Sequence, residues 1–316
     1  MQKENRTLVT GATGVVGSAV VRLLEEKGYE NILSPKRATL DLLCMESVEA
    51  YFSEHKPEYV FMIGAKVGGI VANKSDPVAF LKDNVQMQNN LFDACYRYKT
   101  LKNLFLGSSC IYPRMCEQPM KESSLLSGPL EPTNEGYALA KIMGLKLAQY
   151  YYEQYGMLTV CPMPCNIYGT NDHYDFKQSH VLTALVRRFV DACDDGKEEV
   201  ILWGTGSAKR EFIHVDDVAL ACLFIMQNVD TPETVNIGTG VDISIYDLAH
   251  KIAEKVGYSG NLTWDTSKPD GMPRKCLDIS KSNKMGYHSQ VTMEEGLEKT
   301  IAEYRELKTQ GTVFDK

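Results

Sequence analysis

Short apolar runs alternate with longer amphipathic stretches over the first half of the chain. The short runs, which are rich in apolar and β-branched residues and read as strands, are 7–10, 31–33, 59–63, 104–106 and 158–160. Apolar residues at helical spacing predict helices from Val16 to a stop at Gly28, through 48–52, from Phe80 to Tyr98 and from Tyr137 to Tyr155. Because the strands are apolar throughout, they favour a parallel sheet with helices on both faces.

The alternation of strands and helices breaks down past about residue 166. The remaining chain contains more loops, including the segment 267–275 with its Pro-Asp-Gly-Met-Pro sequence. We therefore expect a smaller lobe, built from discontinuous segments, beside the main parallel-sheet domain.

A glycine-rich turn, Gly11-Ala12-Thr13-Gly14-Val15-Val16-Gly17, joins the first strand to the first helix. In this context Gly11 permits the tight turn, Gly14 lets the backbone approach a pyrophosphate, and Gly17 permits close helix–strand packing. The sequence thus predicts an α/β fold with a Rossmann-type, doubly wound parallel sheet and a discontinuous C-terminal substrate lobe. We expect the cofactor domain to span 1–165 and about 212–240, and the substrate lobe about 166–211 and 241–316.

The residues after the second strand indicate which dinucleotide is bound. NAD enzymes usually carry an acidic residue there for the ribose 2′-hydroxyl, whereas this chain reads Ser34-Pro35-Lys36-Arg37. Cations suit a 2′-phosphate, so NADP(H) is favoured, with a solvated surface charge pair as the alternative.

Composition and charge narrow the class of protein. The net charge of -7 disfavours nucleic acid as a partner. Nine scattered cysteines without a C-x-x-C pair fit a reducing compartment and give no sign of a metal site. The N-terminus lacks the apolar stretch of a signal peptide, and no run of 18 apolar residues suggests a membrane span. We expect a cytoplasmic protein with no membrane partner.

Tyr137 and Lys141 lie four residues apart on one predicted helical face, and Ser108 follows a predicted strand. With the glycine turn, these residues resemble the extended short-chain dehydrogenase/reductase superfamily. The resemblance implies that Lys141 lowers the tyrosine pKa and binds the nicotinamide ribose, Tyr137 exchanges a proton with the reacting oxygen, and Ser108 hydrogen-bonds that oxygen. For Asn84, in the preceding predicted helix, two interpretations stay open. One is a role in catalysis, and the other is a plain polar contact or a place on the helix surface.

Longer segments are more specific than the superfamily pattern. They are 65–73, 106–113, 130–135, 179–181, 200–206, 210–217 and 267–275. They resemble the GDP-L-fucose synthase family, and the resemblance runs from the glycine turn to about Thr300. It implies an NADPH-dependent 3,5-epimerase/4-reductase that converts GDP-4-keto-6-deoxy-D-mannose to GDP-L-fucose, working as a homodimer built through long helices.

The resemblance also assigns roles to individual residues. Cys110 and His180 match an acid/base pair for C3 and C5, whose hydrogens are acidic because both carbons neighbour the C4 ketone. The implied cofactor contacts are Gly11, Thr13, Gly14, Val15, Val16, Gly17, Lys36, Arg37, Leu106, Gly107, Lys141, Pro164, Asn166, Ile167 and His180. The implied substrate contacts are Arg188, Trp203, Arg210, Asp270 and Lys275.

Other interpretations stay open at this stage. A nucleotide-sugar 4-epimerase or a 4,6-dehydratase would share the fold, but dehydratases place an Asp-Glu pair where Ser109-Cys110 stands. A non-catalytic NADP-binding scaffold is disfavoured because Tyr137 and Lys141 are both present. We expect His214 to be structural and Asp216 to cap a helix.

Some positions depart from the family pattern. Ala12-Thr13 stands where some relatives carry an arginine that could reach the 2′-phosphate, and Gly136 where some carry proline. The 166–174 segment, which the resemblance places near the hexose, also differs from some relatives. The sequence therefore determines the geometry of the substrate site least well there.

Overall fold

Six parallel strands form the central sheet of the computed structural model, which describes residues 1–175, 179–268 and 270–313. Their order is β2-β1-β3-β4-β5-β9, with bounds β1 Thr7–Val9, β2 Ile32–Leu33, β3 Tyr59–Met62, β4 Lys102–Phe105, β5 Thr159–Pro164 and β9 Thr234–Ile237. Side chains on both faces of β1, β4, β5 and β9 are buried, which explains why these strands are not alternately polar.

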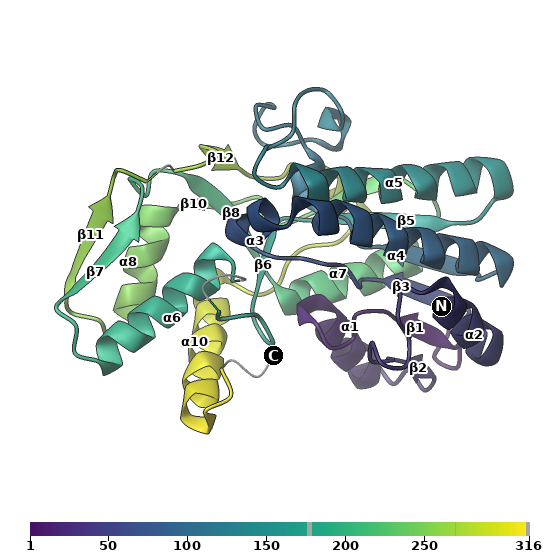
Figure 1. Ribbon diagram of the computed structural model, residues 1–316, viewed down its shortest axis with the longest axis horizontal. Coiled ribbons are helices and arrows are strands. Elements are labelled where there is room, and N and C mark those ends of the chain that lie inside the picture. The colour runs from purple at the N-terminus through teal and green to yellow at the C-terminus, as the bar shows by residue number, and fades with distance from the viewer. Residues whose placement is uncertain (176–178, 269, 314–316) are drawn as a thin grey trace.

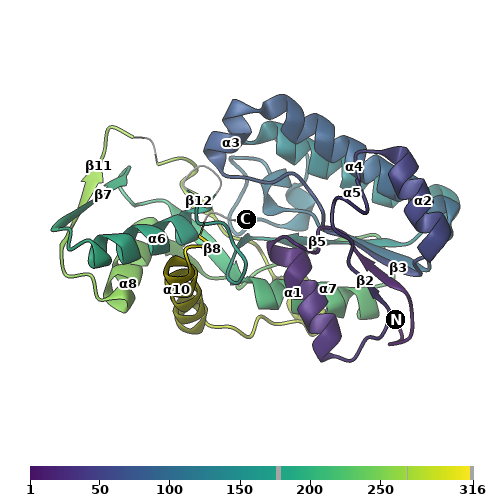
Figure 2. The same ribbon diagram turned by 60° about the horizontal axis from the view of Figure 1, so that its bottom comes forward.

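Helices cover both faces of this sheet, so the doubly wound parallel architecture is confirmed (Figures 1 and 2). One face carries α1 (Val15–Glu26) and α7 (Val215–Asn228); the other carries α2 (Met45–His55), α4 (Pro77–Arg97) and α5 (Glu135–Tyr155). A short helix, α3 (Ile70–Ser75), precedes α4 and was not expected from the sequence. In the sheet, β2 lies on one side of β1 and β3 lies on the other, so the strand order reverses at β1. Ligands of open α/β sheets bind at such a point, which here is the carboxyl edge of β1.

A second hydrophobic cluster lies beside the sheet domain, at the left of Figure 1. It is formed by α6 (Val181–Asp194), α8 (Ile245–Val256) and α10 (Met293–Gln310), with the parallel pair β7 (Glu199–Trp203) and β11 (Asn261–Asp265). A small sheet around β8 (Lys209–His214) joins the two clusters, with β6 (Asn166–Tyr168), β10 (Asp242–Ser244) and β12 (Arg274–Lys275) as its other strands; the short helix α9 (Ser280–Met285) follows β12.

His214 has the structural role that we expected, whereas the prediction for Asp216 is wrong. The buried His214 is the N-cap of α7, where its Nδ1 accepts a hydrogen bond from Asp216 N at 3.3 Å. Asp216 lies in the first turn and instead pairs with Arg22 of α1 at 3.0 Å and Lys299 of α10 at 3.4 Å. The helix dipole favours a carboxylate in the first turn of α7. The two ion pairs of Asp216 link α7 to α1 and to α10.

Within the described ranges, no helix combines the length and apolar composition that a membrane crossing requires.

Candidate active site

The glycine turn leaves room for a phosphate group at the start of α1. Gly11 has φ +68°, and a Cβ there would lie 2.7 Å from Gly64 Cα, so a side chain is excluded. A Cβ on Gly17 would overlap Gly11 O, because the helix passes directly against the turn. The N-cap residue, Gly14, provides no side-chain acceptor for the first amides of α1. These free donors and the helix dipole fit the pyrophosphate of a dinucleotide.

Lys36 and Arg37 follow β2, which pairs in parallel with β1, so their loop emerges beside the glycine turn. Both side chains are exposed, and the Arg37 Nε lies 3.7 Å from Asp41 Oδ1. This position suits a contact with a 2′-phosphate at the adenosine end of the cofactor.

The loop after β6 reaches back over the glycine turn. Asn171 Nδ2 donates to Thr13 O at 2.9 Å and to Ser18 Oγ at 3.2 Å. Asn171 N donates to Glu303 Oε1 of α10 at 2.7 Å. The loop therefore links the cofactor turn to the second lobe, a connection that the sequence did not indicate.

Tyr137 and Lys141 occupy the first turns of α5, at the carboxyl edge of the sheet. Lys141 Nζ donates to Leu106 O at 2.7 Å and lies 5.7 Å from the centre of the Tyr137 ring. Burial lowers the pKa of Lys141 to about 8, so it is a cation at pH 7. Burial also raises the pKa of Tyr137, so its hydroxyl keeps its proton in the resting site.

Cys110 lies on a single 3₁₀ turn, Ser109–Ile111, that follows β4, and Ser108 is the N-cap residue of this turn. Ser108 Oγ accepts a hydrogen bond from Cys110 N at 3.4 Å, which caps the turn. Burial raises the pKa of the Cys110 thiol, while the Lys275 cation, the hydrogen bond with Ser108 and the Lys141 cation oppose this rise. Cys110 is thus a protonated thiol with two cations near enough to stabilise its thiolate.

His180 is the N-cap residue of α6 and lies on the second lobe. Its side chain is exposed, yet desolvation by the surrounding protein lowers its pKa, and the Lys275 cation and His173 act in the same direction. A lowered pKa leaves the imidazole neutral at pH 7, because the nearby Lys275 cation disfavours a second positive charge.

Lys275 connects these groups electrostatically. It lies on β12, opposite Arg210 on β8, and it perturbs the pKa of both Cys110 and His180. Burial and the Arg210 cation lower the pKa of Lys275. The structure therefore brings Ser108, Cys110, Tyr137, Lys141, His180, Arg210 and Lys275 to one region between the two lobes.

The other predicted substrate residues lie along β7 and just after it. Arg188 Nη1 donates to Ile201 O at 2.7 Å, and Trp203, which is 66% exposed, ends the strand. Asp270 Oδ1 accepts from Thr205 N at 2.6 Å, directly after β7. This arrangement offers a flat aromatic face, a cation and a carboxylate at the outer edge of the second lobe.

The remaining predicted cofactor residues line the sheet edge. Leu106 and Gly107 follow β4, and Gly107 N donates to Pro162 O of β5 at 2.9 Å. Pro164 ends β5, while Asn166 and Ile167 begin β6, where Asn166 Nδ2 donates to Glu211 O at 2.6 Å. Thr13 is exposed on the glycine turn, and Val15 and Val16 open α1.

Asn84 has a clear structural contact. Its Oδ1 accepts from Lys66 N at 2.8 Å, and its Nδ2 donates to Lys66 O at 3.0 Å and Phe80 O at 2.7 Å. This buried amide therefore fixes the loop after β3, in agreement with the polar-contact interpretation.

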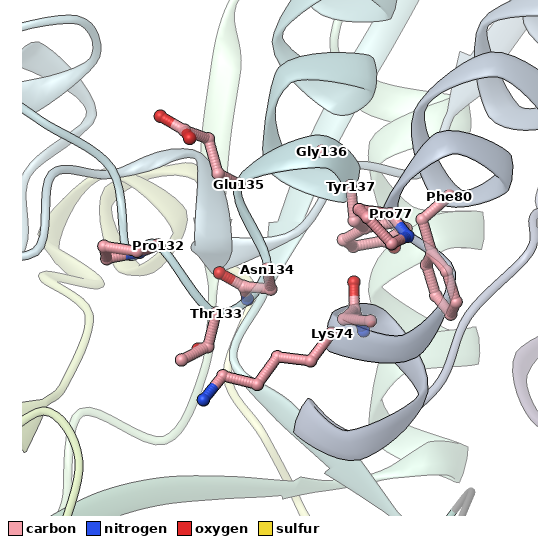
Figure 3. A pocket seen from close by; sticks show the side chains of 10 residues that line it. Lys74, Pro77, Phe80, Pro132, Thr133, Asn134, Glu135, Gly136 and Tyr137 are labelled. Atoms are coloured by element: carbon pink, nitrogen blue, oxygen red, sulfur yellow. The ribbon is translucent and has the colours of Figure 1, made fainter.

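A cavity of about 170 Å³ adjoins Tyr137 and contains residues whose role the sequence did not reveal. It lies between the α3–α4 region and the segment 132–137 (Figure 3). Its lining residues are Asn73, Lys74, Pro77, Phe80, Pro132, Thr133, Asn134, Glu135, Gly136 and Tyr137. Segments 65–73 and 130–135 are family-specific in sequence, and this was the only sequence signal that pointed to these residues.

Comparisons with known proteins agree with this arrangement. The profile of the NAD dependent epimerase/dehydratase family matches residues 7–238. GDP-L-fucose synthase 1 of Arabidopsis thaliana is 48% identical, over 96% of this chain and 94% of its own length. GDP-L-fucose synthase of Escherichia coli is 43% identical, over 94% and 95%.

A solved structure extends the likeness to the fold. The GDP-L-fucose synthetase of Naegleria fowleri bound to NADP superposes with a TM-score of 0.92 at 28% identity, covering 99% of this chain and 96% of that one. The similarity therefore includes both lobes and is not confined to the cofactor domain.

Proposed function

The chain belongs to the NAD dependent epimerase/dehydratase family, and on this basis we propose that it is an NADP(H)-dependent GDP-L-fucose synthase. Its substrate is GDP-4-keto-6-deoxy-D-mannose, which it epimerises at C3 and C5 and reduces at C4. The observation that carries this proposal is the buried Cys110 thiol at a Tyr–Lys reductase site. A plain reductase has no need of a second acid/base group there.

Cys110 and His180 perform the epimerisations. Each inversion requires one group to remove a proton next to the ketone and another to return a proton to the opposite face. The neutral His180 is ready to accept a proton, and the protonated Cys110 is ready to donate one. They come from different lobes, on α6 and on the turn after β4. Ser108 and Tyr137 hydrogen-bond the enolate oxygen that forms in between.

Tyr137 and Lys141 carry the reduction step. NADPH, when bound, supplies the hydride that reduces C4. Tyr137 donates its proton to the C4 oxygen, and the Lys141 cation beneath it favours loss of that proton. Leu106 O holds the Lys141 ammonium at 2.7 Å, so the cation stays fixed at the base of the site.

The basic residues of the second lobe bind the nucleotide end. Arg210 and Lys275 lie side by side on β8 and β12 and suit the diphosphate. Trp203 provides a flat face for the guanine base, and Arg188 and Asp270 lie along the same strand end. This local basic cluster attracts an anionic substrate although the whole chain is acidic.

A second copy of the chain covers the outer face of α4 and α5 to form a homodimer. These two helices run side by side in both ribbon views. Their exposed apolar side chains are Val78, Leu81, Tyr96, Leu139, Tyr150, Tyr152 and Tyr155. An apolar face of this kind is typical of an interaction site.

The test supplies GDP-4-keto-6-deoxy-D-mannose and NADPH and follows the loss of NADPH absorbance. In heavy water, mass spectrometry should find deuterium at both C3 and C5 of the product. Tyr137→Phe should abolish reduction, whereas deuterium exchange should slow but continue because Ser108 still hydrogen-bonds the enolate oxygen. No NADPH consumption and no exchange by the wild-type protein would refute the assignment, and exchange without net oxidation of NADPH would indicate an epimerase only.

A further inference from the structure

The loop after β6 carries a residue that contacts both lobes. Asn171 has φ +69°, a left-handed conformation that residues other than glycine rarely adopt and that asparagine tolerates better than most. Its backbone N donates to Glu303 Oε1 of α10 at 2.7 Å, whereas its side chain reaches the glycine turn that precedes α1. The helices α1 and α10 lie on opposite sides of the boundary between the lobes (Figures 1 and 2), so Asn171 bridges that boundary.

On the sheet-domain side, the amide of Asn171 makes two hydrogen bonds. Its Nδ2 donates to Thr13 O at 2.9 Å and to Ser18 Oγ at 3.2 Å, which uses both amide hydrogens. Ser18 Oγ in turn donates to Val15 O at 3.1 Å. Asn171 therefore holds the carbonyl of one peptide group in the turn directly and the carbonyl of another through Ser18.

The second of these peptide groups belongs to the expected pyrophosphate site. Val15 O shares its peptide group with Val16 N, which lies in the first turn of α1 and has no acceptor within the helix. A hydrogen bond to a carbonyl polarises the N–H of the same peptide group, so the chain from Asn171 through Ser18 strengthens Val16 N as a donor. A phosphate oxygen on that N–H strengthens the chain in return, because the polarisation is mutual.

The other end of the loop is anchored in the second hydrophobic cluster. Tyr174 is 1% exposed, its hydroxyl donates to Thr300 O of α10 at 3.2 Å, and its ring centre lies 4.8 Å from that of Tyr304. Arg187 Nη1 of α6 donates to Tyr174 O at 2.8 Å. The short segment 171–174 therefore connects the glycine turn to α10 and α6.

We propose that Asn171 is a positioning residue that couples dinucleotide binding to the second lobe. Docking of segment 171–174 on the glycine turn and binding of a pyrophosphate there stabilise each other, and the docked segment stabilises α10. The positive φ of Asn171 opposes docking, so a ligand that stabilises one end of the contact shifts its equilibrium. The lobe that carries His180 is thereby held against the sheet domain when the cofactor is bound. The inference requires only a dinucleotide at the glycine turn and goes beyond the proposed function.

Hydrogen–deuterium exchange read by mass spectrometry tests this coupling without turnover. In the wild type, saturating NADP⁺ should slow exchange in α10 by about fivefold or more, although α10 contributes none of the predicted cofactor contacts. Asn171→Gly accepts the positive φ but lacks the amide, so NADP⁺ should slow exchange in α10 by less than about twofold. Asn171→Asp keeps the shape of the side chain and loses the donor, and it should behave as the glycine variant does.

Lys99→Gly is the matched control. Lys99 also has a positive φ, +53°, but it is exposed and follows α4 in the sheet domain, so the effect of NADP⁺ on α10 should stay at the wild-type value. Equal slowing in the wild type and in both Asn171 variants would overturn the coupling, and so would no slowing in the wild type. A wild type that shows the coupling but does not turn over the GDP-sugar would overturn the proposed function alone.

Discussion

Cys110 differs from the buried Cys161 and Cys222 in its electrostatic surroundings. Cys161 and Cys222 have raised pKa values caused by burial alone and behave as small apolar residues. At Cys110 the same desolvation is opposed by two lysine cations, Lys141 and Lys275, and by a hydrogen bond with Ser108. These surroundings suit a thiol that both holds and releases a proton.

Replacing Cys110 by serine should slow proton exchange at C3 and C5 by about a hundredfold or more, because a hydroxyl is a far weaker acid/base group. Reduction of the ketone should continue, since Tyr137 and Lys141 are untouched. Mass spectrometry in heavy water measures the exchange, and NADPH absorbance measures the reduction. Cys44→Ser, at an exposed thiol before α2, is the control and should change neither rate. Equal loss of both activities in a folded Cys110→Ser protein would contradict a separate epimerase role.

The pH profile of kcat/KM should have two limbs set by the free enzyme. The acid limb should lie below 6.5, the ordinary value from which the His180 pKa is lowered, because the base is lost only when the imidazole protonates. The alkaline limb should lie near the Lys141 pKa of about 8, because the cation beside Tyr137 is lost as pH rises through it. A Lys141→Arg variant should move the alkaline limb upward. An unchanged alkaline limb in that variant would exclude Lys141 as its source.

At the scale of the elements, β8 fixes the position of the cations. Glu211 on β8 is fully buried, and its carboxylate accepts hydrogen bonds from Thr239 N, Gly240 N and Leu277 N, each at 2.7 Å. These donors belong to the turn after β9 and to the segment after β12 that follows Lys275. One carboxylate thus holds three segments in register beside the site.

Glu211→Gln should lower the free energy of unfolding by about 1–3 kcal/mol, since the amide NH₂ faces a backbone N–H where a carboxylate oxygen accepted. Urea unfolding followed by circular dichroism measures the loss. The KM for the nucleotide sugar should rise with it, because Lys275 loses its anchor. Glu199→Gln, at an exposed position of β7, should leave both quantities unchanged. A Glu211→Gln protein as stable as wild type would show that the carboxylate bonds are dispensable.

The loop after β2 should control the choice of cofactor. Replacing Lys36 and Arg37 together by alanine should raise the KM for NADPH about tenfold or more and leave the KM for NADH within about twofold, because only NADPH carries the 2′-phosphate. Steady-state kinetics with both cofactors gives the ratio. An equal effect on NADPH and NADH would place the 2′-phosphate elsewhere, for instance nearer Thr13 on the glycine turn.

At the scale of the whole molecule, the site lies where two hydrophobic clusters meet. The sheet domain supplies Ser108, Cys110, Tyr137 and Lys141, and the second lobe supplies His180. Asn171 also joins the lobes by contacting the glycine turn and Glu303 of α10. The proposed epimerase pair, Cys110 and His180, therefore forms only when both lobes are folded against each other.

The quaternary arrangement gives a further prediction. Tyr150 on α5 is 57% exposed, and Tyr150→Glu should convert the proposed dimer to a monomer by placing a charge in its apolar interface. Analytical ultracentrifugation measures the molecular mass. Tyr246→Glu, at a similarly exposed tyrosine of α8, should remain dimeric. A monomeric wild-type protein, or a dimeric Tyr150→Glu protein, would exclude this face as the interface.

Much of the first lobe follows from local patterns. The expected runs at 7–10, 59–63 and 104–106 are β1, β3 and β4, and the expected helix from Tyr137 to Tyr155 is α5 within two residues. Longer-range contacts escaped prediction. Asp216 was expected to cap α7, but the cap is His214, and Asp216 instead contacts Arg22 and Lys299 of distant helices.

The sequence by itself determined the alternation of strands and helices that predicts a doubly wound sheet, the glycine turn and the Tyr137–Lys141 pair. Each of these is set by a pattern of residues within a few positions of one another. Only the tertiary structure decided that Lys275 lies near Cys110 and His180, and that Asn73 and Asn134 share a cavity beside Tyr137. These groups are separated by tens of residues or more, and packing of the lobes brings them together. The desolvation and the nearby cation that set the protonation of the thiol and the imidazole are likewise properties of the packed molecule.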